Sequence, residues 1–186
     1  SRVDINEKSN QVLIMVPTHE LAHQIAFVMT GLTNMMTGIR IKTIVGGASI
    51  YEDARDMREN PPHVIIGCPG RINDMIRRCY INARKFKLVI LDEADEMLSS
   101  GFKEQVYTIF QTLNKDVQLA LFSATLPANI FQTTYKLMRN PVKICVKTES
   151  LTLEGIKQYF VAIEDDRQKY LTLKDLYSHI TLAQCI

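Results

Sequence analysis

Short apolar runs that alternate with longer helical segments are the feature that most limits how this chain can fold. The runs are rich in β-branched residues and apolar on both faces, which is typical of strands covered on both sides. They lie at residues 12–16, 41–45, 64–67, 88–91, 118–122 and 142–146. This alternation predicts an α/β fold with a mostly parallel sheet.

The segments between the runs carry apolar residues at helical spacing. One such stripe contains Leu21, Ile25, Val28, Met29 and Leu32, and another contains Phe102, Val106, Ile109, Phe110 and Leu113. Residues 147–155 are polar and read as a linker, after which 158–163 resembles a strand and 173–180 a helix. We therefore expect a first domain at 1–146, a linker at 147–156 and the start of a second domain at 157–186.

Bulk composition does not identify a partner. The chain has 22 basic and 20 acidic residues, a net charge of +2, which neither predicts nor excludes nucleic acid. The four cysteines form no C-x-x-C pair and no Cys/His cluster with zinc spacing, so we expect reduced thiols in an intracellular protein. No apolar run is long enough to span a membrane, and we expect no membrane partner.

An acidic cluster follows the apolar run at 88–91. Asp92, Glu93 and Asp95 stand at the carboxyl end of the predicted strand, where three carboxylates repel one another. Such clusters persist where a cation or a reacting group needs them. A carboxylate at this place can hold Mg²⁺, and its neighbour can polarise a water molecule. The alternative is a solvated acidic turn that caps a helix.

Two hydroxyl residues, Ser123 and Thr125, follow the next run at 118–122. Their hydroxyl groups can bond a neighbouring carboxylate and transmit its position. A cap on a helix that starts near Pro127 explains them equally well.

Three further turns end predicted strands. Pro17, Thr18 and His19 open a helix whose free N–H groups suit an anion, although a plain N-cap is an equal alternative. The glycines Gly46 and Gly47 allow a backbone to approach a phosphate closely.

The last of these turns contains Cys68, Pro69, Gly70 and Arg71, and its arginine could clamp a phosphate. The glycine turn and this turn, taken singly, are more simply tight turns. Because all five elements follow successive parallel strands, however, they predict one functional edge of one sheet.

These motifs together resemble those of the DEAD-box RNA helicases, and the resemblance covers essentially the whole chain. Residues 92–95 match the D-E-A-D sequence that names the family, and 123–125 match its S-A-T. Residues 17–22 resemble P-T-R-E-L-A, 46–47 the G-G pair, and 68–71 T-P-G-R. The match is nearest to members of the translation-initiation-factor type.

The resemblance implies two RecA-like domains that bind ATP and Mg²⁺ between them and RNA across both. Asp92 would hold Mg²⁺ through water and Glu93 would be the base toward the attacking water. Asp95, Ser123 and Thr125 would couple the ATP site to RNA. The segments 17–19, 46–47 and 68–71 would bind the RNA backbone without sequence preference.

The same resemblance implies a cytoplasmic, monomeric, ATP-dependent RNA helicase activated by a scaffold protein. An ATP-gated RNA clamp of the exon-junction type, with a nuclear location, is one alternative. An ATPase-dead RNA-binding scaffold is another, and Glu93 argues against it.

The chain departs from the family pattern in three places. It contains no G-x-x-x-x-G-K-[ST] sequence, so we expect no ATP hydrolysis by these 186 residues alone. His19 stands where the family has arginine and Cys68 where it has threonine. A mostly neutral imidazole and a weakly donating thiol predict weaker RNA binding, unless neighbouring contacts compensate.

Overall fold

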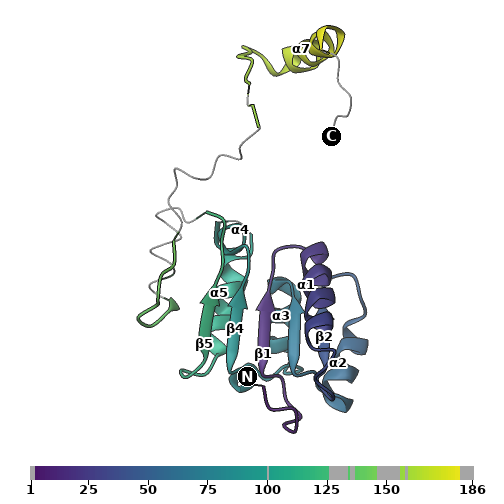
Figure 1. Ribbon diagram of the computed structural model, residues 1–186, viewed down its shortest axis with the longest axis vertical. Coiled ribbons are helices and arrows are strands. Elements are labelled where there is room, and N and C mark those ends of the chain that lie inside the picture. The colour runs from purple at the N-terminus through teal and green to yellow at the C-terminus, as the bar shows by residue number, and fades with distance from the viewer. Residues whose placement is uncertain are drawn as a thin grey trace. The chain divides into compact units, whose positions relative to one another are not determined.

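The computed structural model describes residues 3–99, 101–125, 134, 137–145, 156–157 and 159–180. The chain divides into two units, Ser1–Pro141 and Val142–Ile186. The first unit contains a five-stranded parallel sheet with helices on both faces, as Figure 1 shows. The predicted α/β class is therefore confirmed, whereas the domain and linker boundaries stay predictions.

The sheet consists of β1 (Val12–Met15), β2 (Ile41–Ile44), β3 (Val64–Gly67), β4 (Leu88–Leu91) and β5 (Gln118–Leu121), in the order β2-β3-β1-β4-β5. Every neighbouring pair is parallel. All four residues of the central strand β1 are buried, as the continuous apolar run predicted. Val16, Val45 and Phe122, which we expected to end three strands, lie one residue beyond them.

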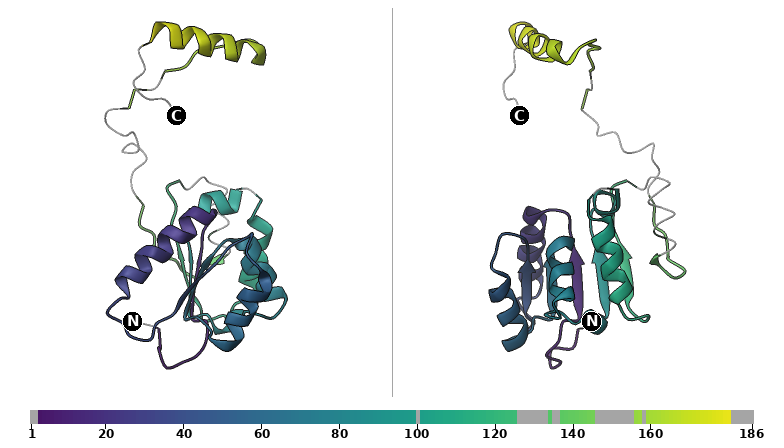
Figure 2. Two further views of the ribbon diagram at one scale, coloured as in Figure 1. Left: turned by 90° about the vertical axis from the view of Figure 1, so that its right-hand side faces the viewer. Right: turned by 180° about the vertical axis from the view of Figure 1, so that it is seen from behind.

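Alternate strand residues point to opposite faces of the sheet and build two apolar clusters. On one face Leu13, Ile65 and Val89 pack with residues of α2 (Ile50–Glu59), α3 (Pro69–Arg77), α4 (Ala94–Ser99) and α5 (Lys103–Thr112). On the other face Ile14 and Ile66 pack against α1 (His19–Leu32). Figure 2 shows the sheet edge-on between these layers.

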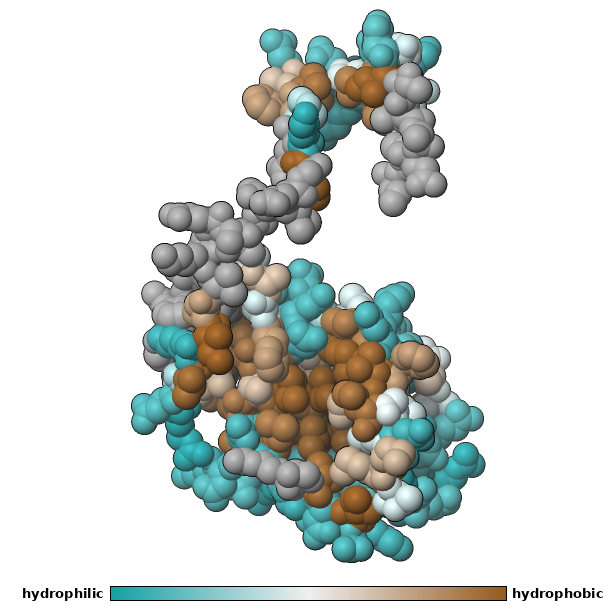
Figure 3. All heavy atoms as spheres, viewed as in Figure 1, coloured by the Kyte–Doolittle hydropathy of each residue, from teal (hydrophilic) through white to brown (hydrophobic). Residues whose placement is uncertain are grey.

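The α1 face is covered unevenly. Helix α1 contacts β2 and β3, while Leu88 and Ile90 of β4 stay partly exposed on the same face. Figure 3 shows the apolar surface on this side of the molecule. Our expectation that every strand is covered on both faces is therefore wrong for β4.

Two predicted strands are not present. Residues 142–145 form no strand, and Val142 and Ile144 are 91% and 93% exposed. Residues 159–163 form none either, and Phe160 is 92% exposed. Apolar β-branched residues become a strand only where a neighbour pairs with them, and no strand among the described residues does so here. Val146 and Gln158 lie outside the described residues, as does the helix expected near Pro127.

The described part of the second unit contains α7 (Asp166–His179), which overlaps the predicted helical stripe. It begins after Asp165, whose side chain accepts a hydrogen bond from the Arg167 amide as an N-cap. A short 3₁₀ helix, η1 (Ala83–Lys85), precedes β4 in the first unit. No helix in the described ranges is long and apolar enough to cross a membrane.

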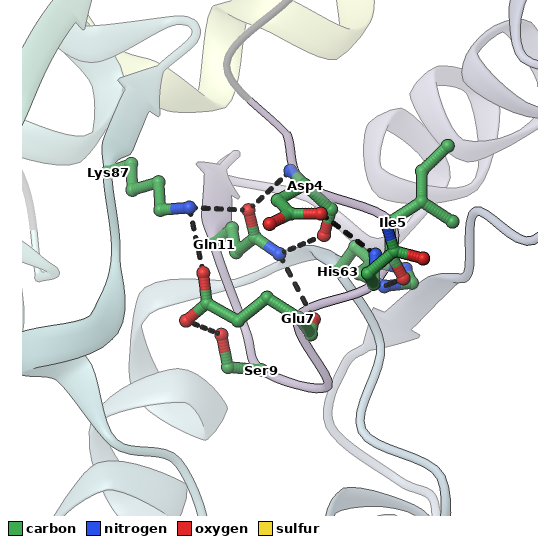
Figure 4. Close-up of polar contacts among 8 residues, drawn as sticks. Asp4, Ile5, Glu7, Ser9, Gln11, His63 and Lys87 are labelled. Atoms are coloured by element: carbon green, nitrogen blue, oxygen red, sulfur yellow. Dashed lines mark hydrogen bonds and ion pairs between the residues drawn. The ribbon is translucent and has the colours of Figure 1, made fainter.

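The amino ends of the strands are closed by a network of polar side chains, shown in Figure 4. Gln11 precedes β1, His63 precedes β3 and Lys87 precedes β4. The loop that contains Asp4 and Glu7 folds back onto these side chains. The polar side chains at this amino edge, the end of the sheet where the strands begin, are bonded to one another. The carboxyl edge, the end where the strands finish, holds the predicted site residues.

Candidate functional site

The five strands end at one level, which places all the predicted turns along one edge. Met15 of β1 is in register with Gly67 of β3 and Leu91 of β4. Ile44 of β2 pairs with Gly67, and Leu121 of β5 pairs with Leu91. The segments that follow these residues therefore share the carboxyl edge, as the sequence predicted.

The turn after β4 presents two carboxylates. The Asp92 amide donates to the Met15 carbonyl at 3.0 Å, which anchors the turn on the central strand. The Asp92 Oδ1 atom accepts from the Glu93 amide at 3.1 Å. Glu93 is exposed and has a φ of 53°. Non-glycine residues adopt this left-handed conformation at a cost of about 1–2 kcal/mol, and such strain concentrates at functional sites.

The next carboxylate, Asp95, joins this turn to the turn after β5. The Asp95 amide donates to Ser123 Oγ at 3.2 Å, and Ser123 Oγ donates to the Thr125 carbonyl at 2.6 Å. Thr125 Oγ1 in turn donates to Asp95 Oδ2. Partial burial raises the pKa of Asp95, but hydrogen bonds from the Thr125 and Ser123 hydroxyl groups and from backbone amides together lower it. The predicted contact between these residues is confirmed.

The turn after β1 opens α1. Thr18 is the N-cap, and its Oγ1 atom accepts from the Leu21 amide at 3.2 Å, so its hydroxyl is used by the helix. Pro17 is buried, whereas His19 is exposed at the edge. A Cβ atom added to Gly46 would lie 3.4 Å from His19 Nε2, which places this ring beside the glycine turn.

The turn after β2 contains the two glycines. Gly47 has a φ of 87°, a conformation that favours glycine. No backbone amide of Gly46, Gly47 or Ala48 donates a hydrogen bond to another residue within the described ranges. The Gly46 and Gly47 amides therefore have no partner among the described residues and can donate to an outside acceptor.

The turn after β3 opens α3. Cys68 is the N-cap but makes no side-chain capping bond. Its thiol is buried, and burial together with the charge of Glu20 raises the pKa of Cys68. Pro69 occupies the first helical position and is buried, which suits its missing N–H group. A Cβ atom on Gly70 would meet nothing within 4 Å, so packing alone does not require this glycine.

Arg71 contacts its own chain in this structure, and its contact with a phosphate stays a prediction. Its Nε atom donates to the Val45 carbonyl at 3.2 Å and its Nη2 atom donates to the Ala48 carbonyl. The Nε atom also lies 4.0 Å from Asp53 Oδ2, and only 13% of the side chain is exposed. The guanidinium group thus binds the glycine turn of its own chain.

Sequence reasoning missed two residues behind this edge. Asp53, on α2, is 4% exposed, and the sequence gives only a weak signal: a carboxylate beside the core positions Ala54 and Met57. Gly67 ends β3, where an added Cβ atom would lie 2.0 Å from the Ile44 carbonyl oxygen. A glycine that ends a buried apolar run is the signal that could have identified it.

The residues present suit Mg²⁺ only in part. Among the residues that the structure describes, no group of three or more His, Cys, Asp or Glu side chains could hold a metal ion. Mg²⁺ usually keeps several waters and binds one or two carboxylates together with substrate phosphates. The oxygens of Asp92, at the end of β4, fit that role, so Mg²⁺ binding by Asp92 through water stays a prediction.

Known proteins were compared with the chain by sequence. A model of the DEAD/DEAH box helicases matches residues 2–133. The ATP-dependent RNA helicase eIF4A of Pyricularia oryzae is 44% identical over 185 residues, and that of Lodderomyces elongisporus is 46% identical. Each alignment covers 100% of this chain and 46% of the relative, so the chain spans about half the length of these relatives.

Solved structures resemble this chain as well. S. cerevisiae Dbp5 bound to RNA and ADP BeF3 has a TM-score of 0.79 and 31% identity, covering 95% of this chain and 44% of Dbp5. A DEAD box protein from the hyperthermophile Methanococcus jannaschii has a TM-score of 0.69 and 37% identity, covering 75% of this chain and 37% of that protein. A second Dbp5 structure, with nup159 and gle1, has a TM-score of 0.66 and 33% identity, covering 73% and 35%. The match over residues 2–133, the 44–46% identity along the chain and the shared RecA-like sheet show that this chain belongs to the DEAD/DEAH box helicase family.

Proposed function

We propose that the full-length protein is an ATP-dependent RNA helicase of the eIF4A type. The observation that carries the proposal is the bonded set of Asp95, Ser123 and Thr125, which ties the acidic turn to the next strand end. The relatives at 44–46% identity are named ATP-dependent RNA helicases. The cofactors of this activity are ATP and Mg²⁺.

In this proposal the acidic turn carries the hydrolytic chemistry. When bound, Mg²⁺ neutralises charge on the ATP phosphates. Asp92 is anchored on β1 by its amide and orients the ion through water. Glu93 is exposed, so its carboxylate can accept a proton from a water molecule.

The bonded set couples this turn to RNA. The Thr125 hydroxyl holds Asp95, and the Ser123 hydroxyl holds the Asp95 amide. A shift of the segment after β5 would therefore move the acidic turn by way of two hydrogen bonds. This contact explains how bound RNA could change the rate of hydrolysis.

The turns after β1, β2 and β3 bind the RNA backbone in this proposal. The amides of Gly46 and Gly47 are unbonded and can donate to phosphate oxygens. The amino ends of α1 and α3, with Pro17, Thr18 and the residues 68–70, favour negative charge nearby. Contacts of this kind position RNA without reading its bases.

A substitution of His19 tests whether the turns after β1 and β2 bind RNA, because its ring is exposed beside Gly46. Arginine carries a permanent charge and can make two bonds to a phosphate. We therefore expect His19→Arg in the full-length protein to bind single-stranded RNA more tightly, by about two- to tenfold. Equal affinity of the two proteins would show that neighbouring contacts already compensate.

A clamp that holds RNA in an exon-junction assembly would use the same residues, and no observation favours it over the helicase. A protein activator, a monomeric state and a cytoplasmic location are part of the proposal. A Dbp5 structure that contains nup159 and gle1 supports the idea that such proteins accept protein partners.

The test is phosphate release by the full-length protein with and without single-stranded RNA. We expect ATP hydrolysis that RNA stimulates, and no measurable turnover by residues 1–186 alone, which contain no G-x-x-x-x-G-K-[ST] sequence. Hydrolysis that ignores RNA, or no hydrolysis by the full-length protein, would contradict the proposal.

A further inference from the structure

The buried carboxylate of Asp53 is not used by the hydrolytic or RNA-binding roles described above. Its Oδ1 atom lies 3.7 Å from Lys42 Nζ, and its Oδ2 atom lies 4.0 Å from Arg71 Nε. Oδ2 accepts no hydrogen bond, although it is buried. Burial raises the pKa of Asp53, while the charges of Lys42 and Arg71 act in the opposite direction.

The neighbouring cation Lys42 is shared with a second acid. Its Nζ atom lies 2.5 Å from Asp56 Oδ2, a carboxylate that is 44% exposed. Lys42 is therefore shared between Asp56 at the surface and Asp53, and Arg71 is a second cation beside the buried carboxylate. The Asp53–Arg71 pair is the buried part of this charge cluster.

Arg71 connects the Asp53 carboxylate to the glycine turn. Its guanidinium group donates to the carbonyls of Val45 and Ala48, which flank the two glycines. The Gly46 and Gly47 amides donate to no other described residue, so the two carbonyl contacts of Arg71 help to hold the turn. The Asp53 carboxylate lies 4.0 Å from the Arg71 Nε atom and attracts the guanidinium group without accepting a hydrogen bond from it.

Stability alone is a poor explanation for the pair. A buried ion pair adds little net free energy, because desolvation offsets the attraction between its charges. The unbonded Oδ2 atom makes the balance worse. Helix α2 is already held against the core by Ala54 and Met57.

We propose that Asp53 is a positioning residue for RNA binding, which acts through Arg71 to hold the 45–48 turn so that the Gly46 and Gly47 amides face the RNA backbone. The inference rests on the proposed function. It assigns Arg71 to the turn of its own chain and requires no direct contact between Asp53 and RNA.

The test is the Asp53→Asn variant of the full-length protein, which keeps the shape of the side chain and removes its charge. We expect the Kd for fluorescent single-stranded RNA to rise about tenfold, a change equivalent to about 1.4 kcal/mol. The RNA concentration for half-maximal ATPase stimulation should rise equally, while kcat at saturating RNA stays unchanged. A merely structural defect would lower kcat at saturating RNA per folded molecule as well, whereas a lower midpoint of unfolding is expected in either case.

Asp74→Asn is the matched control. Asp74 lies on α3, is 40% exposed and forms an ion pair of 2.9 Å with Arg78, so the variant makes the same change in charge at the surface. Its RNA affinity should equal that of the unmodified protein. Asp53→Glu keeps the charge within reach of Arg71 and should bind RNA within about twofold of the unmodified protein.

A double-mutant cycle with Arg71→Gln decides whether Asp53 acts through Arg71. The double variant should bind RNA no worse than Arg71→Gln alone, because the second change removes the link. Three results would overturn the inference. The losses of RNA affinity in Asp53→Asn and Arg71→Gln could be fully additive in the double variant. Asp53→Asn could bind RNA with unchanged affinity, or it could lose as much affinity as Asp53→Glu. Failure of the unmodified protein to bind RNA would instead overturn the proposed function, and this inference with it.

Discussion

The two edges of the sheet use polar side chains in opposite ways. At the amino edge Gln11 is fully buried, and its side chain makes four hydrogen bonds, to the amide and carbonyl of Asp4, to the Glu7 carbonyl and to Lys87 Nζ (Figure 4). At the carboxyl edge Glu93 is exposed in a left-handed conformation, and the amides of the glycine turn are unbonded.

This contrast separates polar groups that stabilise the protein from polar groups that can act on a ligand. A buried donor or acceptor that is already paired contributes to folding and has nothing left to offer. An exposed carboxylate held in a strained turn does little for stability, and its position calls for a role in chemistry. Substitutions at the amino edge should therefore change stability, and those at the carboxyl edge should change activity.

Glu93→Gln should give the largest effect. The amide cannot accept a proton from water, so RNA-stimulated ATP hydrolysis by the full-length protein should fall about 10²–10⁴-fold. The free energy of unfolding should change by less than about 0.5 kcal/mol, because Glu93 is exposed. Glu104→Gln, on the exposed surface of α5, is the control. Turnover that survives Glu93→Gln would refute the catalytic assignment.

Gln11→Leu should show the reverse pattern. Leucine keeps the volume but leaves the Asp4 amide and the Glu7 carbonyl without the Gln11 side chain as their partner. Stability should fall by about 2–3 kcal/mol in denaturant unfolding, since unpaired buried polar groups are costly. Hydrolysis per folded molecule should stay unchanged. Gln111→Leu, at an exposed position on α5, should have little effect on either quantity.

His63 should make the amino edge sensitive to acid. Its Nδ1 atom accepts from the Arg40 amide at 3.0 Å, and Nε2 lies 3.1 Å from the Ile5 carbonyl oxygen, so the ring fits this network in its neutral form. Burial, with a smaller effect of the Arg40 charge, lowers the pKa of His63 below 6.5. Below about pH 6.5 the unfolded chain therefore binds more protons than the folded chain, and the free energy of unfolding decreases as the pH is lowered.

This contribution is fully present above about pH 6.5, and its slope is at most about 1.4 kcal/mol per pH unit. Unfolding measured between pH 7 and 5 should show a smaller pH dependence in His63→Gln than in the unmodified protein. His23→Gln, on the exposed face of α1, controls for the loss of a histidine. Identical slopes for His63→Gln and the unmodified protein would remove His63 from this explanation.

Glycine substitutions at two left-handed residues should have small effects on stability. Cys79 has a φ of 60° where α3 ends, with its amide bonded to the Ile76 carbonyl and the Tyr80 amide bonded to the Met75 carbonyl. Cys79→Gly and Glu93→Gly should each raise stability by about 1 kcal/mol. The first should keep RNA-stimulated hydrolysis and the second should lose it. Loss of hydrolysis in both glycine variants would contradict the distinction between structural and functional left-handed residues.

The sequence predicted the five strands of the sheet and the shared position of their carboxyl ends well because both follow from local patterns. The runs at 64–67 and 88–91 match β3 and β4, and the contact of Asp95 with Ser123 follows from two adjacent strand ends. The direction of Arg71 could not be predicted, because it depends on Asp53, which comes from another element. Residues 142–145 failed as a strand because pairing requires a neighbour, which sequence pattern alone does not supply.

Hydrogen exchange in the full-length protein tests most directly whether ligands use the carboxyl edge alone. Exchange would be measured by mass spectrometry after millisecond labelling, with and without single-stranded RNA, Mg²⁺ and a non-hydrolysable ATP analogue. The account predicts slower exchange in peptides that contain residues 45–49 and 91–95, and unchanged exchange at 9–11 and 61–63. Protection at the amino edge with none at the glycine and acidic turns would contradict it.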